Sequence, residues 1–505
     1  MSNDLRRSVV RAIGSSTMIS VLAKVLSLGS TLVLVRLLSP ADFGLVAIAT
    51  TVTGLVGFFN EIGLGSAIVQ RRDASPDEVD GCFGIAMLAS TGLVAATLAL
   101  AYPAAAFYRM PELGPVLLVL GACLYFGGLN TVPLALLRKQ LRFQPVLWAT
   151  AVGVAVQAVV AIPLAAIGAR YWAIVIGFVV SQFAVTLWYW WIAKWRPGWP
   201  IQLAKGRELM GYGLNITATR VLWHLYMNAD KLIIGRLLGA HAVGIYDVAR
   251  SLSNLPTSQI AGVATNIASP VYARLQDDRA ALGSAMMGLV RAVAYLAFPI
   301  LTGMALLAQP LIATVLGPTW EDAVWPLRAL CVAELVACMA NLQTQLLISS
   351  GNVKRLVRYN LLCALIMPAA LAIGALSAGL IGVALAWAMV YPLVYLWLLA
   401  ETLRLCGMSL RRFCGGLRHP LQGTLLMAAA LLAALHWQPL GVPAAWTLAL
   451  GSVLSAMVYL SHLIYLDRAG LTEVRQVLVD LGLPAAWRRR WPFTRLPMRE
   501  LDGAS

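Results

Sequence analysis

The chain has 505 residues, of which 60% are hydrophobic and only 12% are charged. A soluble domain carries about 25% charged residues, so this composition excludes an ordinary water-soluble protein and predicts an all-α integral membrane protein. Seven cysteines form no CxxC pair, and no HExxH, GxSxG, Walker or Rossmann pattern occurs. We therefore expect no metal site, no catalytic residue, no cofactor and no enzymatic activity.

Apolar stretches of about 20 residues, long enough to cross a bilayer, recur along the whole chain. The first follows Arg6, Arg7 and Arg11 and is too long for the core of a signal peptide, so we expect it to remain as a membrane helix. The predicted spans are 13–38, 43–69, 82–107, 114–137, 146–168, 171–193, 209–238, 243–270, 284–308, 326–349, 357–377, 380–403, 420–437 and 443–466. The sequence thus predicts about 14 transmembrane helices.

The distribution of positive charge sets the predicted orientation. Of the 38 lysines and arginines, 5 lie inside predicted spans and 5 at predicted outer ends, which leaves 28 for the inner loops and the tail. Positive residues concentrate on the cytoplasmic side of membrane proteins, so both termini are predicted to be cytoplasmic. This topology accounts for the net charge of +16 without a nucleic-acid partner.

The sequence also repeats itself at an offset of 200 residues. Residues 32–38 and Gly44 recur as 232–238 and Gly244, and positions 17–49 contain nine identities in 33 ungapped positions. Six spans separate the two copies, so they run in the same direction, as in parallel-repeat transporters. We predict two pseudo-symmetric six-helix lobes at 1–200 and 201–410, two additional helices at 411–466, and a cytoplasmic tail at 467–505.

Polar side chains follow the faces of several predicted spans. A charge at mid-bilayer costs about 2.5–3.5 kcal/mol on insertion scales, so such residues need partners, water or a function. The repeat-bearing spans carry Lys24, Glu61, Arg220, His224, Asn228, Asp230, Lys231, Asp247, Arg250 and Asn254, and the tenth span carries Glu334, Asn341 and Gln345. We predict that these faces enclose a polar cavity with an excess of cations.

Two interpretations of these charges remain open. In the first, the charged residues line a substrate cavity. In the second, the pairs Lys24–Glu61, Lys231–Asp230 and Asp247–Arg250 are structural ion pairs that only fix helix packing. Arg36 and Arg236, at outer helix ends, are expected to reach lipid headgroups rather than substrate. If the cavity binds substrate, cationic groups favour pyrophosphate and amide groups favour sugar.

Several ordered pieces of the chain resemble the Wzx-type polysaccharide flippases of the MOP exporter superfamily, in particular the colanic-acid-type branch. They are Arg36 to Leu45, Gly63 to Arg71, Leu136 to Phe143, Asn228 to Gly239, Ala273 to Asp278, and Gly317 with Trp320. The resemblance extends from the first span to about residue 350, and the last hundred residues contribute no motif.

The resemblance implies a MOP/MATE-like fold and translocation of an undecaprenyl-pyrophosphate-linked oligosaccharide from the cytoplasmic to the periplasmic leaflet of the bacterial inner membrane, by alternating access. The resemblance also implies polymerase and chain-length or export proteins of polysaccharide biosynthesis as partners. In our hypothesis Lys24, Arg220, Lys231 and Arg250 hold pyrophosphate, and Asn228, Asn254, Asn341 and Gln345 contact sugar. Glu61, His224, Asp230, Asp247 and Glu334 serve in ion pairing or in coupling to a proton gradient, a sodium gradient or the membrane potential.

Two other classes of membrane protein compete with this hypothesis. A MATE-like cation-coupled antiporter would favour an acidic cavity and usually 12 spans. A membrane-bound polysaccharide polymerase or ligase commonly carries a large outer loop, whereas the longest outer connection here is about residues 309–325.

Overall fold

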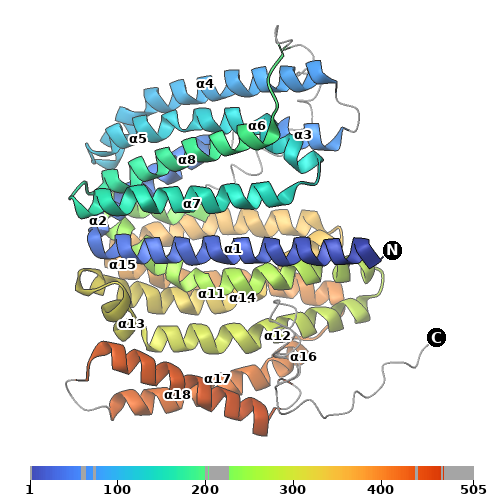
Figure 1. Cartoon of the computed structure of the whole chain (residues 1–505). Coiled ribbons are helices and arrows are strands. Elements are labelled where there is room, and N and C mark those ends of the chain that lie inside the picture. Colours follow the sequence, from blue (N-terminus) through green and yellow to red (C-terminus); the bar gives the residue numbers. More distant parts are fainter. Residues whose placement is uncertain are drawn as a thin grey trace. The chain divides into compact units, whose positions relative to one another are not determined.

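The computed structural model describes residues 3–57, 64–71, 75–198, 203, 227–437, 442–467 and 470, and the regular elements in this part of the chain are all helices (Figure 1). The all-α prediction is therefore confirmed. The chain forms two compact units, Met1–Ser251 with Leu311–Leu327 and Cys363–Trp387, and Leu252–Pro310 with Arg328–Leu362 and Ala388–Ser505.

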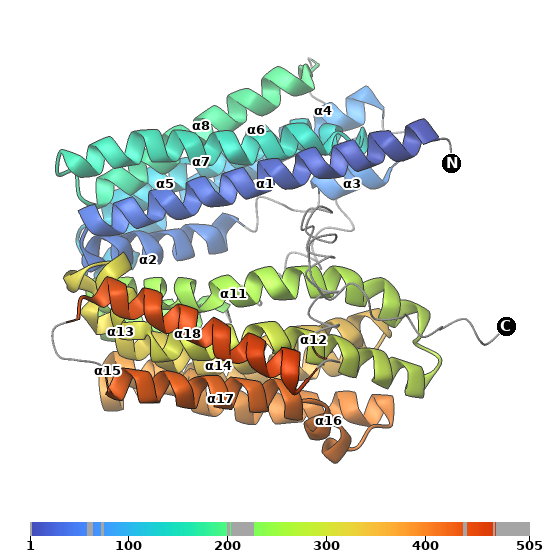
Figure 2. The same ribbon diagram turned by 60° about the horizontal axis from the view of Figure 1, so that its bottom comes forward.

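The first unit contains most of the N-terminal helices. They are α1 (Asn3–Leu37), α2 (Pro40–Gly57), α3 (Leu64–Gln70), α4 (Pro76–Tyr108), α5 (Leu113–Ala122), α6 (Leu124–Lys139), α7 (Phe143–Ala166) and α8 (Tyr171–Ala193). Helix α7 packs between α1 and α8, while α4 packs on α5 and α6, and α2 packs on α5 and α8 (Figures 1 and 2). The expected span 114–137 is thus built from two consecutive helices, α5 and α6, which meet at Cys123.

Local sequence explains where these helices begin. Ser75 and Glu78 form a capping box at the start of α4, in which each side chain accepts a hydrogen bond from the other residue's backbone N–H. Ser39 and Asp42 bond similarly at the start of α2: the Ser39 N–H donates to Asp42 Oδ2 at 3.1 Å, and the Asp42 N–H donates to Ser39 Oγ at 3.3 Å. Because such caps satisfy backbone donors that the helix leaves unpaired, they fix the helix starts.

The remaining helices follow residue 227. Residues 227–237 are helical, followed by α11 (Gly239–Arg274), α12 (Arg279–Leu306), α13 (Ala308–Val315), the 3-10 turn η2 (Pro318–Ala323), α14 (Val324–Ser349), α15 (Val353–Cys406), α16 (Leu410–Gly416), α17 (Arg418–His436) and α18 (Ala444–Tyr465). In the second unit α17 packs on α12 and α18, around a core of Tyr295, Met427, Tyr459 and Leu463.

Helix α15 is two helices joined by a turn. Ala378 and Gly379 have non-helical backbone angles, with φ of 59° at Gly379, a conformation that glycine adopts without strain. An added Cβ at Gly374 would lie 2.7 Å from the carbonyl carbon of Gly382. Eight residues of continuous helix would span about 12 Å, so the chain reverses here. The expected spans 357–377 and 380–403 are thus the two arms of α15.

Ten helices among the described residues are long and apolar enough to cross a membrane. The expected spans 243–270 and 420–437 correspond to α11 and α17, which fall outside those ten. Most of the expected span 209–238 lies outside the described residues. The helical membrane architecture is confirmed, while the count of 14 spans and the lobe boundaries at residues 200 and 410 stay predictions.

Candidate functional site

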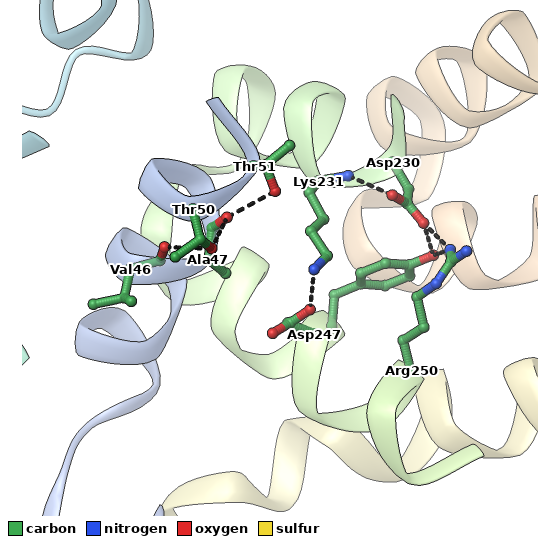
Figure 3. Close-up of polar contacts among 9 residues, drawn as sticks. Val46, Ala47, Thr50, Thr51, Asp230, Lys231, Asp247 and Arg250 are labelled. Atoms are coloured by element: carbon green, nitrogen blue, oxygen red, sulfur yellow. Dashed lines mark hydrogen bonds and ion pairs between the residues drawn. The ribbon is translucent and has the colours of Figure 1, made fainter. Parts of the chain in front are cut away.

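A buried carboxylate organises the polar residues of the first unit (Figure 3). Asp230, in the helical segment 227–237, is fully buried. Its Oδ2 accepts a hydrogen bond from the Tyr246 hydroxyl at 2.7 Å and pairs with the guanidinium of Arg250. Arg250 also donates to the Tyr246 oxygen at 3.0 Å. A buried carboxylate is costly unless it is paired and hydrogen-bonded, and these contacts meet both conditions.

A second ion pair lies beside the first. Lys231 Nζ lies 2.6 Å from Asp247 Oδ1, and Figure 3 shows the lysine pointing toward α11. The side chains of Lys231, Asp247 and Arg250 are 19%, 25% and 24% exposed, whereas Asp230 is 0% exposed. The cations therefore remain accessible while the innermost carboxylate does not.

The pairing differs from the alternative considered for the sequence. That alternative interpretation pairs Lys231 with Asp230 and Asp247 with Arg250. Instead each acid pairs with the cation of the other helix. Adjacent residues point about 100° apart on a helix, so Asp230 and Lys231 direct their side chains to different parts of α11. The crossed pairs consequently tie segment 227–237 to α11.

Sequence reasoning missed two residues of this site, Tyr246 and Trp387. The Arg250 guanidinium carbon lies 4.8 Å from the centre of the Trp387 ring, which comes from the second arm of α15. This is within the range of a cation–π interaction. Tyr246 precedes Arg250 by four residues on the same helix face, a spacing that was available in the sequence. Trp387 is 137 positions from Arg250 (387 minus 250), and no local pattern connects them.

The four charged residues of this cluster balance one another, and the predicted excess of cations stays a prediction. Among the four residues, Asp230 and Asp247 offset Arg250 and Lys231. Any excess of cations must come from Lys24 and Arg220, and Lys24 lies on an exposed part of α1. Glu61, Arg220 and His224 lie outside the described residues.

The amide residues are distributed over three helical segments. In the second unit Asn254 Nδ2 donates to Glu334 Oε1 at 3.2 Å, which joins α11 to α14. Asn341 is exposed on α14, whereas Gln345 donates to the Ser349 hydroxyl one turn later at 3.1 Å. Asn228 is half-buried near the start of segment 227–237. The structure therefore brings Asn254 to Glu334 but gives Gln345 a partner within its own helix.

The two repeated arginines, Arg36 and Arg236, both contact groups of the protein. Arg36 Nε donates to the carbonyl of Val315 at 3.1 Å, and the guanidinium also bonds the carbonyl of Thr314. These are terminal carbonyls of α13, which attract a cation. Arg236 lies over the ring of Phe107 at 5.2 Å. Both arginines thus contact protein groups, and their contact with lipid headgroups stays a prediction.

The motif residue Trp320 has a structural role at the same end of α1. It is fully buried and its Nε1 donates to the carbonyl of Val35 at 2.9 Å. The ring also packs edge-on against Phe43 at 5.5 Å. Gly317, the other residue of this motif, has a φ of 99° and permits the turn that leads into η2.

Comparisons with solved structures identify the fold. The lipid II flippase MurJ in an inward closed conformation gives a TM-score of 0.72 at 13% identity, covering 88% of this chain and 97% of that one. An inward-facing multidrug resistance MATE transporter of the MOP superfamily gives a TM-score of 0.62 at 18% identity, covering 77% and 96%. At these identities the likeness establishes the MOP-type fold and no more.

Comparisons with sequences identify the family. The lipopolysaccharide biosynthesis protein WzxC of Escherichia coli (strain K12) is 24% identical over 393 residues, which is 76% of this chain and 79% of that protein. The succinoglycan biosynthesis transport protein ExoT of Rhizobium meliloti (strain 1021) is 24% identical over 304 residues, 59% and 60% of the two chains. A family described as "Polysaccharide biosynthesis protein" matches residues 33–325, more than half of the chain. The chain therefore belongs to the polysaccharide biosynthesis protein family, in which the Wzx-type flippases of the MOP superfamily are found.

Proposed function

We propose that this protein moves a lipid-linked oligosaccharide across the membrane for polysaccharide biosynthesis. The observation that carries the proposal is the family match over residues 33–325, in a chain with the fold of the lipid II flippase MurJ. The finer proposal is an undecaprenyl-pyrophosphate carrier that crosses from the cytoplasmic to the periplasmic leaflet of a bacterial inner membrane. Both termini would then be cytoplasmic, as the distribution of lysine and arginine favours.

Of the four proposed pyrophosphate ligands, Arg250 and Lys231 are the two whose ion pairs the structure describes. Guanidinium groups bind phosphate oxygens with two parallel hydrogen bonds, and ammonium groups act as point charges. Both cations are paired with carboxylates here, so pyrophosphate would replace Asp247 at Lys231 and compete with Asp230 at Arg250. Lys24 and Arg220 would supply the net positive charge that the carboxylates cancel in this arrangement.

Sugar recognition is proposed for the amides Asn228, Asn254, Asn341 and Gln345. Asn254 and Arg250 lie one turn apart on α11, so a pyrophosphate at Arg250 would present its first sugar along the same helix. Glu334 accepts a hydrogen bond from Asn254 and would release this amide when sugar binds. Amides both donate and accept, which suits the hydroxyl groups of sugars.

Exchange of ion pairs also offers a route for energy coupling. A carboxylate released from Lys231 or Arg250 would become free to bind a proton or sodium ion, and we propose Asp230, Asp247 and Glu334 as candidates together with Glu61 and His224. Moving one charge across the membrane is worth about 2.3 kcal/mol per 100 mV. A gradient or the membrane potential would therefore suffice to bias the cycle.

The second candidate function is a MATE-like antiporter for small cations. The observation that favours it is the similarity of the fold to a MATE transporter, with a TM-score of 0.62. The described cluster argues against it, because Asp230 and Asp247 are already neutralised by protein cations and leave no acidic excess for a cationic drug.

Native mass spectrometry of the purified protein tests the proposal. We expect a co-bound polyprenyl-pyrophosphate oligosaccharide that is lost in Arg250→Ala and partly kept in Arg250→Lys, while Arg404→Ala behaves as wild type because that side chain is 75% exposed at the end of α15. A co-purified cationic drug, or retention of the lipid by Arg250→Ala and Lys24→Ala with full export in cells, contradicts the assignment.

A further inference from the structure

Two helices of the first unit touch backbone to backbone at one point. Gly44 in α2 and Gly244 in α11 are both buried. A Cβ added to Gly44 would overlap the carbonyl oxygen of Ala240 and lie 2.7 Å from the backbone nitrogen of Gly244. A Cβ added to Gly244 would overlap the carbonyl oxygen of Pro40 and lie 3.0 Å from the nitrogen of Gly44. Because the obstacles are backbone atoms, no side-chain movement can make room.

This contact is symmetric with respect to the internal repeat. Gly44 and Gly244 are equivalent positions at the 200-residue offset, and so are their obstacles, Pro40 and Ala240. Each glycine therefore contacts the start of the helix from the other copy. Gly44 faces Ala240 near the start of α11, and Gly244 faces Pro40 at the start of α2. A reciprocal contact of this kind places the pseudo-two-fold axis of the repeat between the two glycines.

Other helix ends also make close contacts near the point where α2 and α11 touch. The end of α1 is joined to α13 and η2 through Arg36 and Trp320. An added Cβ at Gly235 would meet Ile48 and Tyr108 at 2.9 and 3.3 Å, so segment 227–237 is similarly tight against the first copy. These helix ends lie on the side that the charge distribution predicts to face outwards. Within the first unit, the outer ends of α1 and α2 are thus packed tightly against segment 227–237, α13, η2 and the start of α11.

We propose that Gly44 and Gly244 are positioning residues for transport, which allow the two repeats to close the outer end of the translocation path. Small residues let membrane helices approach closely, and a contact made of backbone atoms can separate without repacking side chains. A side chain at either position holds α2 and α11 apart and shifts the population toward a state that is open on that side. This inference rests on the proposed transport function, because a closable end has meaning only for a substrate path.

A cysteine reporter measures the closure directly. Thr50 is exposed on α2, six residues beyond Gly44 (50 minus 44). Thr50→Cys is placed in a Cys414→Ser background, because Cys414 is the exposed cysteine in the described part of the chain. Labelling with a membrane-impermeant maleimide is compared in spheroplasts and in inverted vesicles. We expect Gly44→Ala and Gly244→Ala to raise labelling from the outer side by roughly tenfold.

Matched controls lie on the same two helices. An alanine at Gly57 of α2 would meet only one Leu124 methyl at 3.5 Å, and an alanine at Gly262 of α11 meets nothing within 4 Å. Gly57→Ala and Gly262→Ala are therefore expected to label like the parent protein. Alanine favours helix formation over glycine, so loss of helicity would not explain an effect at Gly44 or Gly244.

The outcomes separate this inference from the proposed function. Increased outer labelling in both glycine variants, without change in the controls, supports closure whatever the substrate is. If labelling rises but wild-type protein carries no lipid-linked oligosaccharide, the closure stands and the proposed substrate falls. If both variants label like the parent, or if one does not accumulate while the other labels like the parent, the glycines are only packing residues and the inference is overturned.

Discussion

Each unit of the molecule buries an aspartate beside a tyrosine, with different surroundings. Asp230 in the first unit is fully buried and pairs with Arg250 while accepting a bond from Tyr246. Asp467 in the second unit is 5% exposed, bonds the Tyr295 hydroxyl, and accepts from the Gly470 N–H at 2.9 Å. The contacts described for Asp467 are to neutral groups. Similar burial thus has two structural consequences: Asp230 pairs with the cation of another helix, and Asp467 holds the end of α18 against α12.

The largest expected effect comes from Asp230→Ala, because it removes the buried carboxylate that pairs with the partly buried Arg250. Removing one partner of a buried ion pair costs about 3–5 kcal/mol. We expect a markedly lower thermal unfolding midpoint of the purified protein in detergent. The double variant Asp230→Asn with Arg250→Gln should recover much of this loss and still fail to export polysaccharide. Full export by the double variant would show that the pair is structural.

Asp467→Asn should have a smaller effect of a different kind. It weakens the bond from Tyr295, and a disturbed buried hydrogen bond costs about 1–3 kcal/mol. We expect a reduced unfolding midpoint with unchanged lipid binding per folded molecule, measured by native mass spectrometry. Tyr295→Phe is the matched variant and should behave alike. A selective loss of lipid binding in either would remove the distinction between the two aspartates.

The Trp387 ring offers a test of how Arg250 is positioned. Trp387→Leu removes the cation–π contact, which is worth about 0.5–2 kcal/mol, whereas Trp387→Phe keeps an aromatic face. We expect weaker retention of the lipid in Trp387→Leu and partial recovery in Trp387→Phe. Equal retention in both would mean that the ring only fills space.

The smallest effect is expected at Glu401, a carboxylate outside both buried clusters. It pairs with Arg355 at 3.0 Å and with Arg404 at 3.1 Å, and the two arginine side chains are 36% and 75% exposed. Exposed ion pairs contribute about 0–1 kcal/mol. Glu401→Gln should therefore leave the unfolding midpoint and export within error of wild type. If Glu401→Gln lowered the unfolding midpoint as much as Asp230→Ala, the exposure of an ion pair would not determine its contribution to stability in this protein.

The general architecture was accessible from the sequence because it depends on local properties. Apolar runs of span length predicted the helices, and the caps at Ser39 and Ser75 mark two of their starts. The polar faces also indicated which helices carry charge. The partners of those charges could not be predicted from the sequence. Asp230 pairs with Arg250 and not with its neighbour Lys231, and Trp387 contacts Arg250 from a distant helix.

The 200-residue repeat by itself predicted two parallel copies in which Gly44 and Gly244 correspond. Only the tertiary structure decided that these two glycines touch each other, that Arg36 caps α13, and that the acids and cations pair across helices. The physical reason is that periodicity along one helix fixes which side chains share a face. Which face meets which depends on how closely two backbones can approach, and that is a property of both helices together.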